Sequence, residues 1–159
     1  MRPLLFFLAA FSVPFAAGCG NDESTPPAAG STIRTAGNIE FELEDVGPGA
    51  AGGARATLRS SGASHTRIVV EGLGEGAPGG GGPNQSHLHR GTCEHPASSG
   101  SHQLKPLTGD ESVTVVAVPL ANLLTGEWFV DIHLPRTQGG GDPEVVACGD
   151  VPDATGPDG

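Results

Sequence analysis

Short runs of alternating apolar and polar residues, separated by glycine-rich turns, constrain the fold of this chain more than any other feature. The run "IEFELEDV" alternates apolar Ile39, Phe41 and Leu43 with acidic residues, and a period of two is that of a half-buried strand. Further strand-like runs are "ARATLRS", "HTRIVVEGL", "SVTVVAVPL", "GEWFVDIHL" and "EVVACGDV", whereas no stretch has sustained helical periodicity. Six to eight short strands at this spacing predict an antiparallel β-sandwich or barrel.

The N-terminus has the order of features found in an export signal. Arg2 precedes the apolar run "LLFFLAAFSV", which is too short for an ordinary transmembrane helix but suits a signal-peptide core. The following "FAAGC" resembles the lipobox of bacterial lipoproteins. We therefore expect a signal peptide over residues 1–18 and a lipid on Cys19, with the protein exported and anchored at the periplasmic face or the cell surface. The alternative is an ordinary secretory signal, with Cys19 an incidental thiol.

Composition divides the rest of the chain into a folded segment and two polar ends. Residues 19–37 are rich in proline and glycine and predict a flexible tether, and residues 153–159 predict a disordered tail. Residues 38–152 have the size of a single domain. The formal net charge is −10, and loss of Arg2 with the leader would make it −11. Such an acidic chain excludes nucleic acid and anionic lipid surfaces as partners, so we expect membrane contact through the lipid only.

Three cysteines in an exported chain leave one odd thiol. If Cys19 carries lipid, Cys93 and Cys148 remain as a pair in an oxidising compartment. A bridge between them would stabilise the fold by about 4 kcal/mol in the chain-entropy model.

Two of the six histidines stand two residues apart in "QSHLHRGTCEHP". Residues two apart on a strand point to the same face, so His87 and His89 would present both imidazoles to one side. A stable metal site needs further ligands, and His133, near the end of a later strand, becomes a neighbour if the two strands pair. Three or four imidazoles suit copper or zinc, and affinity alone favours copper. Alternating histidines on an exposed strand also occur without any metal.

The ordered set "SHLHRGTC", "FVDIHL" and "VVACGDV" resembles the copper/zinc superoxide dismutase superfamily, and most closely its shortened bacterial relatives, including CHRD-type domains. The resemblance covers roughly residues 38–151 and implies an eight-stranded Greek-key β-sandwich of immunoglobulin-like shape. It also implies three copper ligands and one disulfide: His87, His89 and His133, and Cys93 with Cys148.

The chain lacks the long loop that carries the bridging and zinc ligands in the active enzymes of that family. Only "EHPASSGSHQLKPLTG" separates Cys93 from the next strong strand, so we expect no full zinc site. His95 and His102 in this stretch are the candidates for a fourth copper ligand. Asp131 shares a strand face with His133, where it either orients a ligand imidazole or is a solvated acidic residue.

An anion-attracting arginine stands three residues before the terminal cysteine in the active enzymes. This chain has Val145 there, and Arg90 and Arg136, each close in sequence to a ligand histidine, are the candidates to replace it. Dismutation needs an anion to enter the site, and the negative net charge opposes that. We therefore expect copper binding before efficient dismutation of superoxide.

These features predict an extracytoplasmic, lipid-anchored copper-binding protein with a superoxide dismutase-like fold. If the protein is an enzyme, it is a copper-only superoxide dismutase, and the sequence assigns no catalytic residue. Copper storage or delivery would use the same site without turnover. The alternative is a non-catalytic interaction or structural module without metal. The position of His133 relative to His87 and His89 discriminates between the two classes.

Overall fold

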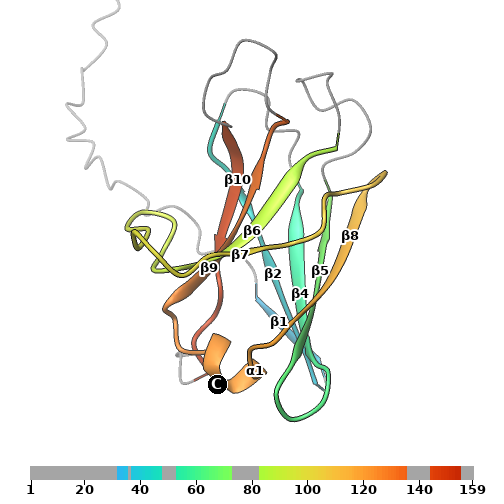
Figure 1. Ribbon diagram of the computed structural model, residues 1–159, viewed down its shortest axis with the longest axis vertical. Helices are drawn as coiled ribbons and strands as arrows, with labels where there is room; N and C mark the ends of the chain where they lie inside the picture. The colour runs from blue at the N-terminus through green and yellow to red at the C-terminus, as the bar shows by residue number, and fades with distance from the viewer. Residues whose placement is uncertain (1–31, 36, 48–52, 73–82, 136–143, 155–159) are drawn as a thin grey trace, which may run out of the picture.

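The computed structural model describes residues 32–35, 37–47, 53–72, 83–135 and 144–154, and these form two antiparallel β-sheets packed face to face (Figure 1). The predicted all-β sandwich is confirmed at this level. The segments 1–31, 48–52, 73–82, 136–143 and 155–159 lie outside the described residues, and with them the expected signal peptide and Cys19. Within the described part of the chain, no helix is long and apolar enough to cross a membrane.

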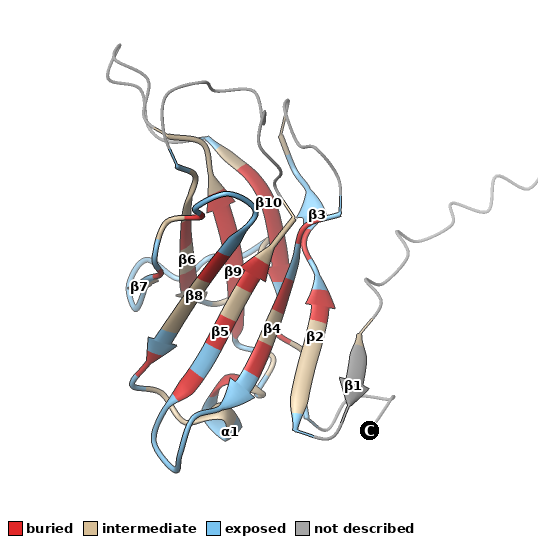
Figure 2. Ribbon diagram, turned by 90° about the vertical axis from the view of Figure 1, so that its right-hand side faces the viewer, coloured by how far each residue is buried: buried red, intermediate tan, exposed pale blue. Residues whose placement is uncertain are grey.

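The first sheet has the strand order β1-β2-β4-β5-β8. Its strands are β1 (Ile33–Thr35), β2 (Asn38–Glu42), β4 (Arg55–Ser60), β5 (Thr66–Glu71) and β8 (Glu111–Val116). Successive residues alternate between a buried face, which includes Leu58 and Ile68, and an outer face, which includes Arg59 and Arg67. Figure 2 shows this sheet toward the viewer, with the second sheet behind it.

The second sheet has the strand order β3-β10-β9-β6-β7. Its strands are β3 (Glu44–Asp45), β10 (Val145–Asp150), β9 (Trp128–His133), β6 (Gln85–Arg90) and β7 (His102–Gln103). The register between β9 and β10 shifts between Val145 and Ala147, as at a β-bulge. The four-residue helix α1 (Leu120–Leu123) lies between β8 and β9.

The core fills the space between the two sheets. From the first sheet it takes the inward residues Phe41, Leu58, Ile68 and Val70, and from the second Leu88, Trp128, Val130, Ile132 and Val146. Leu88 is fully buried although it stands between two half-buried histidines. The period of two therefore sends Leu88 into the core and His87 and His89 to the outer face of the second sheet.

Seven strands have five or six residues, and three have only two or three: β1, β3 and β7. The three short strands lie at sheet edges, where brief pairing limits aggregation with other chains. Such short pairings leave no periodic pattern, which is why the sequence did not reveal β1 and β7. β3 lies within the run "IEFELEDV", which the sequence analysis treated as one strand. The described residues thus hold ten strands, against the eight that the family resemblance implied.

The folded region extends beyond the predicted boundaries. Strand β1 (Ile33–Thr35) falls inside the segment assigned to the tether, yet it pairs with β2. At the other end, the amide of Ala154 donates a hydrogen bond to the carbonyl of Leu124, within the segment predicted to be disordered. Backbone pairing is thus also described on both sides of residues 38–152, the range expected for the domain.

Candidate metal centre

The histidine pair and His133 come together because β6 and β9 are antiparallel neighbours. In their register His87 lies opposite Asp131, His89 opposite Phe129 and Gln85 opposite His133. Alternation along β9 places Phe129, Asp131 and His133 on the outer face, while Trp128, Val130 and Ile132 enter the core. One outer-face patch therefore carries three imidazoles and one carboxylate.

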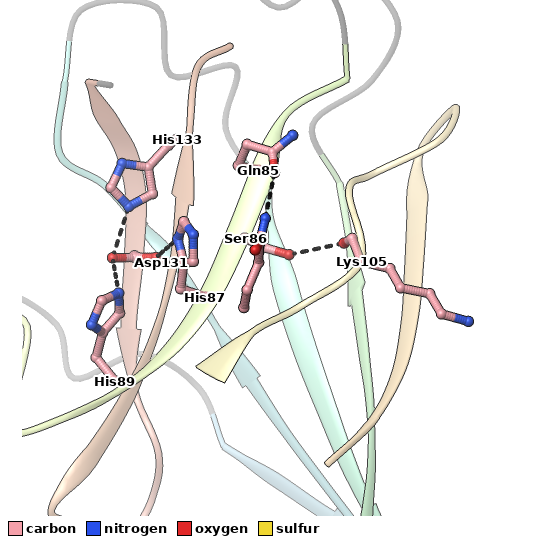
Figure 3. Close-up of polar contacts among 8 residues, drawn as sticks. Gln85, Ser86, His87, His89, Lys105, Asp131 and His133 are labelled. Carbon is pink, nitrogen blue, oxygen red and sulfur yellow. Dashed lines mark hydrogen bonds and ion pairs between the residues drawn. The ribbon is translucent and has the colours of Figure 1, made fainter. Parts of the chain in front are cut away.

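Asp131 lies at the centre of this patch, between the three imidazoles (Figure 3). Its Oδ2 atom is 3.2 Å from Nε2 of His89 and 3.0 Å from Nε2 of His133. Its Oδ1 atom is 3.4 Å from Nδ1 of His87. One donor atom from each residue can be chosen so that all four lie within 4.8 Å of one another, so this group could hold a metal ion.

Two of these contacts have the spacing of neighbouring ligands in a tetrahedral metal site. Metal–nitrogen and metal–oxygen bonds of about 2.0–2.1 Å place the ligands of a tetrahedron roughly 3.3 Å apart. The contacts from Oδ2 of Asp131 to His89 and His133, 3.2 and 3.0 Å, are near this distance, whereas His87 lies 3.4 Å from the other carboxylate oxygen, Oδ1. The outer limit of 4.8 Å is longer, so a bound ion would draw some of the donors together.

Asp131 is only 5% exposed, although its carboxylate carries charge. Among the described residues, Oδ1 of Asp131, Nδ1 of His87 and Nε2 of His89 are buried without a hydrogen-bond partner. A buried carboxylate is costly unless a cation or several donors compensate it. Each of these three atoms can donate a lone pair, and a cation bound between them would compensate the carboxylate.

The charge state of His87 supports the same assignment. Burial lowers the pKa of His87 below its ordinary value of 6.5, and this outweighs the opposing attraction of Asp131. The nearby imidazoles of His133 and His89 lower this pKa further. At neutral pH the His87 imidazole is therefore neutral, which is the form that coordinates a metal and the form that does not neutralise Asp131.

Ring contacts and a disulfide hold the residues around the site in place. The ring of His89 stacks on Phe129 with centroids 5.1 Å apart, and the rings of His87 and His133 meet edge to face at 4.9 Å. On the other side of β9, Cys148 of β10 lies opposite Asp131 and forms a disulfide with Cys93. The disulfide ties the loop after His89 to the strand beside Asp131.

The two expected fourth-ligand candidates do not join the group. His102 lies opposite Leu88 in β7, on the core side of the sheet, and its ring is 5.8 Å from that of Trp128. His95 is exposed in a turn in which its amide donates to the carbonyl of Thr92. Asp131 takes the fourth place instead, as part of the only metal-compatible group among the described residues.

The candidates for an anion-attracting arginine also lie elsewhere. The guanidinium of Arg90 is 4.7 Å from the ring centroid of Trp128, which belongs to the core, so it faces away from the imidazoles. Arg136 lies outside the described residues. Val145 lies directly opposite His133 in the β9–β10 pairing, so the position that the family gives to arginine does adjoin the site.

Sequence reasoning found three of the four residues and gave the fourth a lesser role. Asp131 was expected to orient a ligand or to be solvated, but it is buried among the imidazoles. The available signal was the spacing "DIH", which places Asp131 and His133 on one face just as "HLH" does for the histidine pair. What the sequence lacked was the register that sets Asp131 opposite His87.

Comparisons with protein-family models, with curated proteins and with solved structures find no match to this chain.

Proposed function

We propose that this protein is an extracytoplasmic copper-binding protein, held at the cell envelope by a lipid on Cys19, with a fold of the superoxide dismutase type. The observation that carries the proposal is the convergence of His87, His89, His133 and Asp131 on one sheet face. Oδ1 of Asp131, Nδ1 of His87 and Nε2 of His89 are buried there without a hydrogen-bond partner among the described residues. The disulfide between Cys93 and Cys148 is compatible with an oxidising, extracytoplasmic compartment.

Copper is the metal that this donor set favours. Imidazole nitrogens bind copper and zinc well, and at equal availability the affinity order places Cu(II) above Zn(II). The described part of the site offers no sulfur ligand, which favours Cu(II) over Cu(I). Asp131 adds one negative charge, which further favours a divalent ion.

The strand connections support the proposed Greek-key, superoxide dismutase-like topology. The chain leaves the first sheet after β5, enters the second at β6, returns at β8 and crosses again to β9. As a result β5 pairs with β8 and β6 pairs with β9, so each pair spans a connection through the opposite sheet. The metal-ligand strands β6 and β9 are therefore joined by pairing and not by a hairpin.

Dismutation of superoxide requires the bound copper, so we propose it only as a second step after metal binding. Bound copper would supply an ion that changes its oxidation state by one electron. The residues of this chain oppose rapid anion entry, because Val145 adjoins His133 where the family has arginine and Arg90 faces the other side of the sheet. Asp131 also fills a coordination position close to the imidazoles, whereas catalytic sites keep one position open. We expect slow turnover at most, and copper storage or delivery uses the same residues without it.

The test is Cu(II) loading of the purified full-length protein, measured by metal analysis and electron paramagnetic resonance. The expected result is one equivalent of copper with hyperfine structure from several nitrogens. His133→Ala should lose this signal, while His102→Ala, a histidine on the opposite side of the same sheet, should keep it. Zinc in place of copper after loading with an equimolar mixture would correct the metal and keep the site.

The alternative proposal is an interaction or structural module without metal. It predicts weak copper binding that is equal in the wild type, His133→Ala and His102→Ala. The short distances between the imidazoles and Asp131 weigh against it, because a module without metal has no need of a carboxylate buried among three imidazoles.

The lipid anchor is tested separately, by mass spectrometry of the N-terminal peptide after expression in a bacterial host that lipidates lipoproteins. The expected result is an acylated Cys19 at the new N-terminus, and Cys19→Ser should release the protein from the membrane fraction. An unmodified thiol at Cys19 would support the ordinary secretory signal instead.

A further inference from the structure

Three exposed carboxylates lie beside the metal centre, on its β10 side. Asp150 of β10 is two residues beyond Cys148, and Cys148 lies directly opposite Asp131. Asp150 and Asp131 are therefore diagonal neighbours on the outer face of the second sheet, about 7–8 Å apart between Cα atoms. Glu44 of β3 lies opposite Cys148 on the far side of β10, which places it roughly 10 Å from Asp131. The third carboxylate belongs to Glu94, in the loop that follows β6.

One cavity of about 340 Å³ brings these carboxylates together with the disulfide. Its lining includes Glu44, Glu94, Asp150, Cys93 and Cys148. Asp150 also accepts a hydrogen bond of 2.8 Å from the amide of Cys93, which holds the loop against β10. Because Cys148 lines the cavity and lies opposite Asp131, the cavity adjoins the metal centre.

No basic residue neutralises the three carboxylates within the described part of the chain, where none of them takes part in an ion pair. A fourth carboxylate in the lining, that of Glu42, lies opposite Arg55 of β4 and is not counted with them. On its described strands, the outer face of the second sheet has no lysine or arginine. Lys105 is directed away from the imidazoles (Figure 3), and Arg90 contacts Trp128.

The carboxylates around the cavity do not form a second metal site. Among the residues that the structure describes, the one group that could hold a metal ion is that of the three imidazoles and Asp131. Asp131 is only 5% exposed and its Oδ1 atom has no hydrogen-bond partner there, so the metal centre is where a cation is needed. The side chains of His87 and His89 are 25% exposed, which lets a cation reach them from solvent. The three carboxylates can therefore act on the cation only during its approach.

We infer that the metal centre takes up copper as a positively charged species, attracted over β10 by Glu44, Glu94 and Asp150. This inference rests on the proposed function of copper binding. Fixed charges of one sign raise the association rate of an oppositely charged partner by about 10–10³-fold, and the effect falls with ionic strength. Hydrated Cu(II) or a cationic copper complex is thus the substrate, whereas copper held by an anionic carrier such as citrate is repelled. The same charges oppose the approach of superoxide, which is an anion.

The experiment is stopped-flow uptake of Cu(II) by the metal-free, full-length chain with Cys19→Ser, near neutral pH and in about 10 mM salt, where the Debye length is about 30 Å. Trp128 is the only tryptophan and stands in β9 with two of the ligands, so quenching of its fluorescence reports the arrival of the paramagnetic ion. The variant Glu44→Gln/Glu94→Gln/Asp150→Asn should lower the association rate constant for CuCl₂ by about tenfold, because it removes three charges that act on a divalent cation across roughly 10 Å of water. In about 0.5 M NaCl the difference should fall below about twofold, and the dissociation rate constant should not change.

Two double variants separate a local effect from the net charge. Glu44→Gln/Glu94→Gln keeps Asp150 and its hydrogen bond to Cys93, and it should lower the association rate constant by about fivefold. Asp110→Asn/Glu111→Gln makes the same change in net charge with two exposed carboxylates of the other sheet, at the start of β8, and should leave the rate constant within about twofold of wild type.

The charge of the copper complex gives the complementary test. Neutral Cu(II) bis-glycinate should be taken up at a rate that neither salt nor the triple variant changes, and anionic Cu(II) citrate should load the triple variant faster than wild type. Full copper loading at equilibrium shows that a variant is folded with its metal centre intact. Equal rate constants for CuCl₂ in the fully loaded wild type and triple variant would overturn this inference alone, as would a wild-type rate constant that does not depend on salt. A wild type that takes up no copper would overturn the proposed function and this inference with it.

Discussion

Replacement of Asp131 by asparagine should change the stability of the protein in opposite directions with and without copper. Asp131→Asn keeps the shape of the side chain and removes its charge. In the metal-free protein the carboxylate is 5% exposed, and the lowered pKa of His87 leaves that neighbour neutral at pH 7.5. Removal of a buried charge beside the neutral His87 should therefore stabilise the metal-free fold, or leave it unchanged.

The magnitude follows from the environment of the carboxylate. A buried polar group without a partner, as Oδ1 of Asp131 is among the described residues, costs about 1–3 kcal/mol, and a charged group costs more. The variant keeps the oxygen and loses the charge, so we expect a gain within this range. For a domain of this size about 1 kcal/mol corresponds to roughly 4 °C in Tm, so the metal-free variant should melt up to about 10 °C higher. At a free copper concentration 100 times the dissociation constant, the wild type should gain about 2.7 kcal/mol in the free energy of unfolding, or roughly 10 °C in Tm. The variant should lose most of this gain.

The assay is differential scanning calorimetry at pH 7.5 after chelation, with and without added Cu(II). Glu127→Gln is the control, because it removes an exposed carboxylate away from the imidazoles. If Asp131 instead formed ion pairs with protonated histidines in a protein without metal, its replacement would break a buried pair and cost about 3–5 kcal/mol. A lower Tm of metal-free Asp131→Asn, with a copper shift equal to that of wild type, would refute the reasoning.

Three further predictions concern stability. Leu88→Ala should lower the free energy of unfolding by about 2–5 kcal/mol in urea titration, because Leu88 is fully buried between the sheets; a cost below about 1 kcal/mol would mean that β6 is not packed as described. Reduction of the disulfide between Cys93 and Cys148, which closes a separation of 55 residues, should cost about 4 kcal/mol, and Cys93→Ala/Cys148→Ala should match the reduced protein. Burial lowers the pKa of His87 in the folded state below its ordinary value of 6.5. The metal-free protein should therefore lose stability as the pH falls through 6.5 toward the folded-state pKa, because the unfolded chain binds the proton first. His87→Gln should flatten this dependence in urea titrations at pH 7.5 and 5.5.

The fold class and most of the strands could be predicted from local pattern. Apolar residues with a period of two, broken by glycine, identify the strands because one face of each strand must be buried. The same period placed His87 and His89 on one face with Leu88 on the other, as the structure has them. The short strands β1 and β7 escaped prediction, since pairing at a sheet edge needs hydrogen bonds and no apolar face. The change of sheet between β2 and β3, within one predicted run, also left no signal in the sequence.

The candidate site was predictable only in part. The sequence by itself determined which residues share a strand face: His87 with His89, and Asp131 with His133. Only the tertiary structure decided that β6 and β9 are neighbours in the register that sets His87 opposite Asp131, and that His102 faces the core. The physical reason is that alternation along a strand is a local property, whereas pairing and register depend on how both sheets bury their apolar faces together.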